Sequence, residues 1–238
     1  MFIWESSDDQ AVVDPSQALP GRSEPILADP MPHAVLGTPI LGEPGDGQEV
    51  IYLASGCFWG AEKAAWELGA DATAVGYMGG STPNPTYEEV GTGQTGHAET
   101  VRVLYSPVAL PTERLLQAFF ESHDPTSLNR QGGDVGTQYR SAVFPTTAAQ
   151  ESLAREMIKT YQKVLTEGGY GDIVTEIVPA PAAGAFYPAE DYHQQYLAKN
   201  PGGYQCHART GMACPLPQSG PLRPGPADDS PSRGRDDA

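Results

Sequence analysis

Residues 50–68 read VIYLASGCFWGAEKAAWEL, an apolar run followed at once by a helical pattern. The run at 50–54 is short and apolar, which is typical of a buried strand. Apolar side chains then recur at helical intervals, at Phe58, Ala61, Ala65 and Leu68. We therefore expect the chain to leave a strand and enter a helix close to Cys57.

The same two patterns alternate through the rest of the chain. We expect further strands at 72–77, 100–105, 140–144 and 172–178. We expect helices that begin at Pro111 and Thr147 and a short helix near 191–199. Thr147 and Gln150 have the spacing of a capping box, and Gly168-Gly169 is a typical helix end. Long polar segments at 78–96 and 124–138 are expected to be loops.

This order of elements resembles a split βαβ arrangement, in which helices pack on one mixed sheet. We therefore expect an α+β fold: a two-layer α/β sandwich of ferredoxin-like plan, with extra elements and long irregular termini. A doubly wound parallel sheet is the alternative, and periodicity does not exclude it.

Charge and proline are unevenly distributed along the 238 residues, whose net charge is −16. Residues 1–49 contain nine acidic residues, one basic residue and seven prolines, which predicts an irregular acidic arm. We expect a catalytic domain at 50–200 and a mobile segment with two cysteines at 201–216. The proline-rich remainder, 217–238, has little to bury and is expected to be disordered.

Composition also excludes several classes of function. The acidic charge argues against nucleic-acid binding, and no apolar run approaches the roughly 18 residues of a membrane span. The N-terminus lacks the basic and apolar regions of a secretory signal. Three cysteines are too few for a disulfide framework, so we expect a cytoplasmic protein whose cysteines do chemistry. Since no spare apolar helix face suggests an interface, we expect a monomer.

Cys57 is the strongest candidate for a reactive group. A cysteine at the start of a helix lies beside free N–H groups, which lower the pKa of a thiol from about 8.5. The flanking Gly56 and Gly60 leave room for a substrate, and Phe58 and Trp59 would wall the site. The alternative is a buried cysteine that acts only as a small apolar side chain.

Two more cysteines, Cys206 and Cys214, lie near glycines close to the C-terminus. Mobile thiols can reach another sulfur, as thiol–disulfide exchange requires. Inert cysteines, or a metal site formed with His207, are the alternatives, although the spacing is not that of a zinc knuckle.

Polar candidates lie in and beside the two long loops: Tyr87, Glu99, Asp134 and Tyr139. An acid beside an apolar wall has a raised pKa and can donate a proton, and tyrosine hydroxyls can stabilise an oxyanion. Taken singly, a solvated acid and a half-buried tyrosine remain the simpler interpretations.

Together these segments resemble the peptide methionine sulfoxide reductase A family, peptide-methionine (S)-S-oxide reductases. The matching blocks are GCFWG at 56–60, GYMGG at 76–80, TPNPTY at 82–87, GHAE at 96–99, GTQYRS at 136–141 and AEDYHQQY at 189–196. The resemblance covers nearly all of 50–214 and extends weakly to ALPGR at 18–22.

The resemblance implies an enzyme that reduces the S epimer of methionine sulfoxide, free or in proteins, and repairs oxidative damage. It implies that Cys57 attacks the sulfoxide sulfur and becomes a sulfenic acid, while Glu99, with Tyr87 and Tyr139, acts on the sulfoxide oxygen. Cys206 would then form a disulfide with Cys57, and Cys214 would pass it to thioredoxin. No metal or cofactor is implied.

The resemblance also implies the residues that bind the substrate. Phe58 and Trp59 would hold the methyl group, and Asp134 would support the polar side. His193 lies in a matching block and would contribute to binding or to structure. Because an ionised Glu99 would raise the pKa of Cys57, we expect Glu99 to be protonated before the substrate binds.

Two other functions fit parts of the sequence. A cysteine hydrolase would use Cys57 with His97 or His193 as base and would give Cys206 and Cys214 no role. A non-enzymatic redox or metal-binding module would bind zinc. Neither explains Glu99 together with two loop tyrosines.

Overall fold

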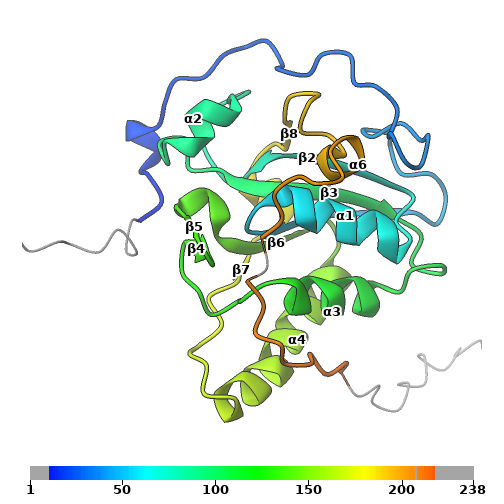
Figure 1. The fold of residues 1–238 in the computed structure, drawn as a ribbon, viewed down its shortest axis with the longest axis vertical. Coiled ribbons are helices and arrows are strands. Elements are labelled where there is room, and N and C mark those ends of the chain that lie inside the picture. The colour runs from blue at the N-terminus through cyan, green and yellow to red at the C-terminus, as the bar shows by residue number, and fades with distance from the viewer. Residues whose placement is uncertain (1–10, 207, 218–238) are drawn as a thin grey trace, which may run out of the picture.

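The computed structural model describes residues 11–206 and 208–217. Its main sheet has the strand order β7-β6-β1-β3-β2-β8 (Figure 1). The strands are β1 Glu49–Ser55, β2 Ala72–Met78, β3 Ala98–Tyr105, β6 Ser141–Pro145, β7 Glu176–Ile177 and β8 Tyr187–Pro188. A separate hairpin joins β4 Arg130–Gln131 and β5 Asp134–Val135.

Three long helices pack with this sheet, and several one-turn elements connect them. The long helices are α1 Phe58–Leu68, α3 Thr112–Ser122 and α4 Ala148–Glu167. The short ones are α2 Tyr87–Gly91, α5 Ala180–Ala183, α6 Tyr196–Lys199 and the 3-10 turns η2 Pro15–Gln17 and η3 Thr137–Tyr139.

Strand directions confirm the split βαβ arrangement. β3 is antiparallel to both β1 and β2, so β1-α1-β2 is a crossover between two parallel strands that lie on either side of β3. β1 is also antiparallel to β6, so β3-α3-β6 forms the second such unit around β1. Within the described residues only the β6–β7 pair is parallel, which makes the doubly wound alternative wrong.

Side chains on the two faces of β1 belong to two different apolar clusters, as expected for a strand that is covered on both faces. Ile51 and Leu53 join the main core with side chains of α1, α3 and α4, among them Phe58, Phe120 and Tyr161. Ala54 belongs to the opposite cluster, which the segment 178–186 covers. All of β1 is therefore held rigidly up to Ser55, the residue from which the chain turns towards Cys57.

The predicted helix ends agree with the structure. Thr147 and Gln150 form the complete capping box of α4, and Gly168 is its C-cap. α1 begins at Phe58 with Cys57 as its N-cap residue, and it ends at Gly69 in the left-handed conformation.

The structure corrects the predicted strand at 172–178, of which only Glu176–Ile177 pairs in the sheet. Before it, Ile173 N–H donates to Gln162 Oε1 and Val174 N–H donates to Pro125 O. These backbone N–H groups bond to α4 and to a loop instead of to a neighbouring strand. The alternation of apolar side chains here therefore comes from their packing and not from strand pairing. The short α2, α5 and β8 were not predicted, since two to five residues give little periodic signal.

The described parts of the N-terminal and C-terminal segments run along the outside of the domain (Figure 1). The N-terminal segment, irregular apart from η2, is bonded to the sheet where Arg102 donates to the carbonyls of Ile40 and Gly42. The C-terminal segment runs from α6 towards α3 and α4, where Tyr161 donates to Met212 O. The tail predicted to be disordered lies, apart from Pro217, outside the described residues. Across 11–206 and 208–217 no helix is long and apolar enough to cross a membrane.

Candidate active site

Cys57 lies at a turn that only glycine permits. Gly56 has φ 89°, and a Cβ there would lie 2.6 Å from Cγ of Gln131. Directly after Cys57, the Phe58 N–H donates to Glu99 Oε2 at 3.0 Å. The predicted thiol and the predicted acid are therefore neighbours at the first turn of α1.

Glu99 is buried, with 2% of its surface exposed. Burial raises its pKa to about 8, the Phe58 N–H opposes this, and the charge of Asp134 adds to it. Glu99 is thus mostly protonated at neutral pH and can donate a proton, as the sequence argument expected.

The pKa of Cys57 is raised, whereas its position at a helix start had predicted a lowered value. Burial is the main cause, and the charge of Glu99 adds to it more than that of Asp134 does. The hydrogen bond with the backbone of Trp59 opposes these effects without reversing them. The helix terminus is therefore outweighed by desolvation, and the free thiol is protonated.

The two predicted tyrosines keep their hydroxyl protons. Burial, followed by the charge of Glu99, raises the pKa of Tyr87 to about 12 and also raises that of Tyr139. The charges of Asp134 and Cys57 act on both hydroxyls as well. The structure therefore brings these five groups into one electrostatic environment, with the tyrosines as hydrogen-bond donors.

Trp59 lies in a cluster of aromatic rings. It stacks on Tyr196 with ring centroids 3.9 Å apart, and its Nε1–H donates to Nδ1 of His193 at 3.1 Å. Phe58 lies deeper, 1% exposed, with its ring 6.0 Å from that of Tyr77. Phe58 is thus part of the core beneath the predicted methyl pocket, and Trp59 is its half-buried neighbour.

His193 is a buried, neutral imidazole. Burial lowers its pKa to about 4. Since Nδ1 accepts from Trp59, the proton lies on Nε2, which has no hydrogen-bond partner among the described residues. Nε2 is 3.9 Å from Oε2 of Glu190. His193 is therefore fixed in the aromatic cluster and retains an unused donor.

Asp134 does not bond to the other predicted site residues. It lies in the β4–β5 hairpin and accepts from the hydroxyl of Tyr204 at 3.0 and 3.1 Å. Tyr204 precedes Cys206 by two residues, so Asp134 ties the C-terminal segment to the site.

Cys206 is close to Cys57, and Cys214 is not part of that site. Cys57 and Cys206 line the same small cavity, and the Cys206 thiol donates to Gln131 O at 3.5 Å. All three cysteines are free thiols. Cys214 lies in the main core, fully buried, with its N–H bonded to Glu121 and its carbonyl bonded to Gln117. The sequence predicted a mobile segment here, and in this structure Cys214 is packed in the core.

The rival functions find less support. His97 accepts from Gly80 N–H through Nδ1 and is bonded to Thr82 O through Nε2, so neither nitrogen is available as a base. Within the described residues no cluster of three or more His, Cys, Asp or Glu side chains could hold a metal. His207 lies outside them.

Sequence reasoning missed residues that support the site from a distance. Glu190 accepts from the Tyr87 N–H at 2.9 Å and from the Tyr77 hydroxyl at 3.1 Å. Glu62, buried in α1, accepts from Gln195 N–H at 2.8 Å, beside the aromatic cluster. Glu190 lies in the AEDYHQQY block, which was the one available signal for it. Nothing in the local pattern distinguishes Glu62 from a solvated helix residue.

Known proteins resemble this chain over most of its length. The family model described as peptide methionine sulfoxide reductase matches residues 49–215. The peptide methionine sulfoxide reductase MsrA of Corynebacterium kroppenstedtii is 53% identical, over 86% of this chain and 94% of the relative. That of Agrobacterium fabrum is 51% identical, over 90% of this chain and 99% of the relative.

Solved structures agree in fold. Methionine sulfoxide reductase A of Corynebacterium diphtheriae superposes with a TM-score of 0.79 at 46% identity, covering 88% of this chain and 100% of that one. Reduced Mxr1 from Saccharomyces cerevisiae gives a TM-score of 0.62 at 36% identity, covering 70% of this chain and 94% of that one.

Proposed function

The chain belongs to the peptide methionine sulfoxide reductase family, and from that premise we propose which side chains carry its reaction. It is a thiol-dependent peptide-methionine (S)-S-oxide reductase, an enzyme of protein repair. The observation that carries the assignment is the buried Glu99, bonded to the N–H that follows Cys57.

In the first step Glu99 gives its proton to the sulfoxide oxygen, with the hydroxyls of Tyr87 and Tyr139 donating to the same oxygen. This makes the substrate sulfur electrophilic, and the sulfur of Cys57 attacks it while the Cys57 proton passes to the Glu99 carboxylate, which is thereby reprotonated. The sulfur–oxygen bond of the substrate breaks, methionine departs, and Cys57 retains the oxygen as a sulfenic acid. Trp59 and Phe58 shape the apolar side of the pocket, and His193 holds Trp59 in place.

Two thiols then return Cys57 to its reduced form. Cys206 attacks the sulfenic acid, water leaves, and a Cys57–Cys206 disulfide forms. Cys214 next attacks Cys206, so that Cys57 is released as a thiol and the disulfide moves to Cys206–Cys214. An external dithiol, which we propose is thioredoxin, reduces that bond, so two thiols supply the electrons and no cofactor is needed. Asp134 supports these disulfide exchanges because it holds Tyr204, and with it the segment that carries Cys206.

Separate S and R epimers of a methionine sulfoxide derivative test this proposal, with thioredoxin as reductant. We expect turnover of the S epimer alone and its loss in Cys57→Ser. Cys206→Ser and Cys214→Ser should lose turnover yet still release one methionine per enzyme. Folded protein that reduces neither epimer would overturn the assignment, and turnover undiminished by Cys206→Ser would overturn the relay.

A further inference from the structure

The N-terminal segment is joined to the loop that carries Tyr87. Leu19 N–H donates to Gln94 O at 2.9 Å, and Thr82 Oγ1 donates to Leu19 O at 2.8 Å. Arg22 N–H donates to Pro83 O at 3.0 Å. The segment 19–22 thus lies along the loop 82–94 and is hydrogen-bonded to it.

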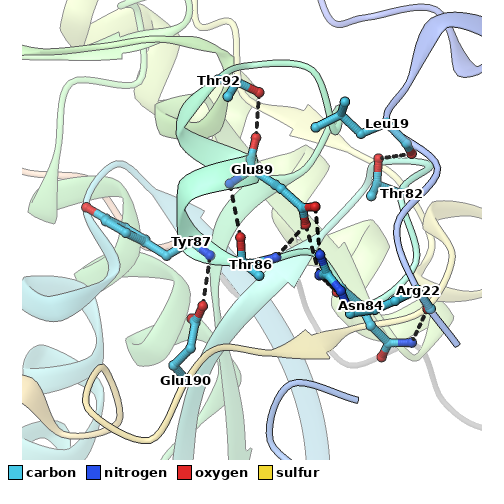
Figure 2. Close-up of polar contacts among 9 residues, drawn as sticks. All are labelled: Leu19, Arg22, Thr82, Asn84, Thr86, Tyr87, Glu89, Thr92 and Glu190. Atoms are coloured by element: carbon cyan, nitrogen blue, oxygen red, sulfur yellow. Dashed lines mark hydrogen bonds and ion pairs between the residues drawn. The ribbon is translucent and has the colours of Figure 1, made fainter. Parts of the chain in front are cut away.

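Arg22 makes the most directional of these contacts. Nη1 and Nη2 donate to the two oxygens of Glu89 at 2.9 and 2.7 Å, and Nη1 also donates to Asn84 O at 2.6 Å (Figure 2). The amide of Asn84 returns a hydrogen bond to Arg22 O at 2.9 Å. A two-pronged contact of this kind fixes direction as well as distance.

The carboxylate that Arg22 holds also closes the start of α2. Glu89 Oε2 accepts from Thr86 N–H at 2.9 Å, and Thr86 Oγ1 accepts from Glu89 N–H at 3.2 Å. α2 has only five residues, and so short a helix is not stable alone. Its position therefore depends on the groups that hold it from outside.

Tyr87 is the first residue of α2. Figure 2 shows its side chain directed away from Arg22, on the other side of the helix. The backbone N–H of Tyr87 donates to Oε1 of Glu190 at 2.9 Å. Arg22 and Glu190 thus fix one helical turn from two directions, and the place of the Tyr87 hydroxyl follows from both.

We propose that Arg22 is a positioning residue for the reductase reaction, which acts through Glu89 and α2 to place the Tyr87 hydroxyl at the sulfoxide oxygen. The inference rests on the role proposed for Tyr87. In this proposal a residue of the acidic N-terminal segment contributes to the geometry of the site. Arg22 is 65 positions away from Tyr87 in sequence.

A double-mutant cycle tests this in the full-length chain, with Arg22→Ala, Tyr87→Phe and both together. The readout is the single-turnover rate constant of methionine release from the S epimer, at a temperature where every variant is folded. Arg22→Ala should slow release by roughly 10- to 100-fold, because misplaced groups lose catalysis steeply. In the Tyr87→Phe background the same substitution should have less than about a twofold effect.

The matched control is Arg155→Ala. Arg155 also pairs with a glutamate, Glu151 at 2.8 Å, but on the surface of α4, and its loss should not change the rate. Arg22→Lys retains the charge without the two-pronged contact, so it should recover only part of the rate.

The possible failures are distinguishable. An equal slowing by Arg22→Ala in both backgrounds, or none in either, would overturn the inference and leave the role of Tyr87 intact. If Tyr87→Phe alone has no effect, the proposed role of Tyr87 is wrong and the inference falls with it. Loss of release in Cys57→Ser would still support the reductase assignment in that case.

Discussion

Glu99 and Cys57 need opposite proton states although they are neighbours. Burial raises the pKa of both groups, which keeps Glu99 ready to donate and keeps Cys57 a thiol until the substrate arrives. An ionised Glu99 would oppose a thiolate, and transfer of the Cys57 proton to Glu99 during the attack prevents both groups from being negatively charged together. The proposed reaction is thus coupled to the proton of Glu99.

This coupling predicts a pH dependence. Since the pKa of Glu99 is raised to about 8, single-turnover methionine release should fall as pH rises through about 8 and the proton is lost. In Glu99→Gln, release should be slower by about 10²-fold or more, and this alkaline decline should disappear. Quenched release at pH 6 to 10 measures both effects. A decline that persists unchanged in Glu99→Gln would assign it to another group.

The same shift predicts that stability also falls as pH rises, but over a lower pH range than activity does. The ordinary pKa of Glu99 is 4.5, so the unfolded chain loses this proton at a lower pH than the folded one does. The free energy of unfolding of the wild type should therefore fall, relative to Glu99→Gln, as pH rises from about 5 to 8, by at most about 1.4 kcal/mol per pH unit. Urea unfolding of both proteins across this range measures it. A constant difference would show that Glu99 is not buried as a neutral acid.

At the scale of elements, the sequence predicted what periodicity and capping encode. The long helices, the four central strands and the Thr147 cap were recovered because each follows from side chains repeated within a few residues. Cys57 and Glu99 were recognised because a corner cysteine and a matching block single them out. The raised pKa of Cys57 and the buried place of Cys214 depend on residues distant in sequence, which no local pattern reports.

The capping box of α4 gives a prediction that concerns stability alone. Thr147 Oγ1 accepts from Gln150 N–H at 3.2 Å, and neither residue is part of the proposed site. Thr147→Ala should lower the free energy of unfolding by about 1 kcal/mol and leave methionine release unchanged. Thr160→Ala, at a half-buried position within the same helix where no cap is removed, should not destabilise the protein. Equal losses in both variants would show that the cap contributes nothing specific.

Gly76 gives a prediction for strand pairing. A Cβ on Gly76 would overlap the carbonyl oxygen of Tyr187 and lie 2.6 Å from Cζ of Phe186. Gly76→Ala should displace β8 and lower the free energy of unfolding by roughly 1 to 3 kcal/mol. It should also slow methionine release, because β8 leads directly into Glu190, which holds Tyr87. Gly171→Ala, whose Cβ would meet nothing within 4 Å, is the control for both measurements.

At the scale of the whole molecule, the proposed relay needs the C-terminal segment in two places. Cys206 lines the same cavity as Cys57, so the first proposed disulfide joins two residues that already share one space. Cys214 is held among α3 and α4 by Gln117 and Glu121, so the second exchange requires this part of the segment to leave the core. We therefore expect the buried Cys214 thiol to react only after Cys206 has reacted.

Thiol labelling tests this order. In variants that retain a single cysteine, native Cys214 should react with iodoacetamide at least about 10²-fold more slowly than Cys206, because it is fully buried and burial raises its pKa to about 12. Adding Gln117→Ala and Glu121→Ala should accelerate the labelling of Cys214, whereas Glu113→Ala on the same helix should not. The same pair of substitutions, in the three-cysteine protein, should speed transfer of the disulfide from Cys57–Cys206 to Cys206–Cys214. If native Cys214 is labelled as fast as Cys206, the segment is already free in the reduced enzyme, and release from α3 and α4 does not order the relay.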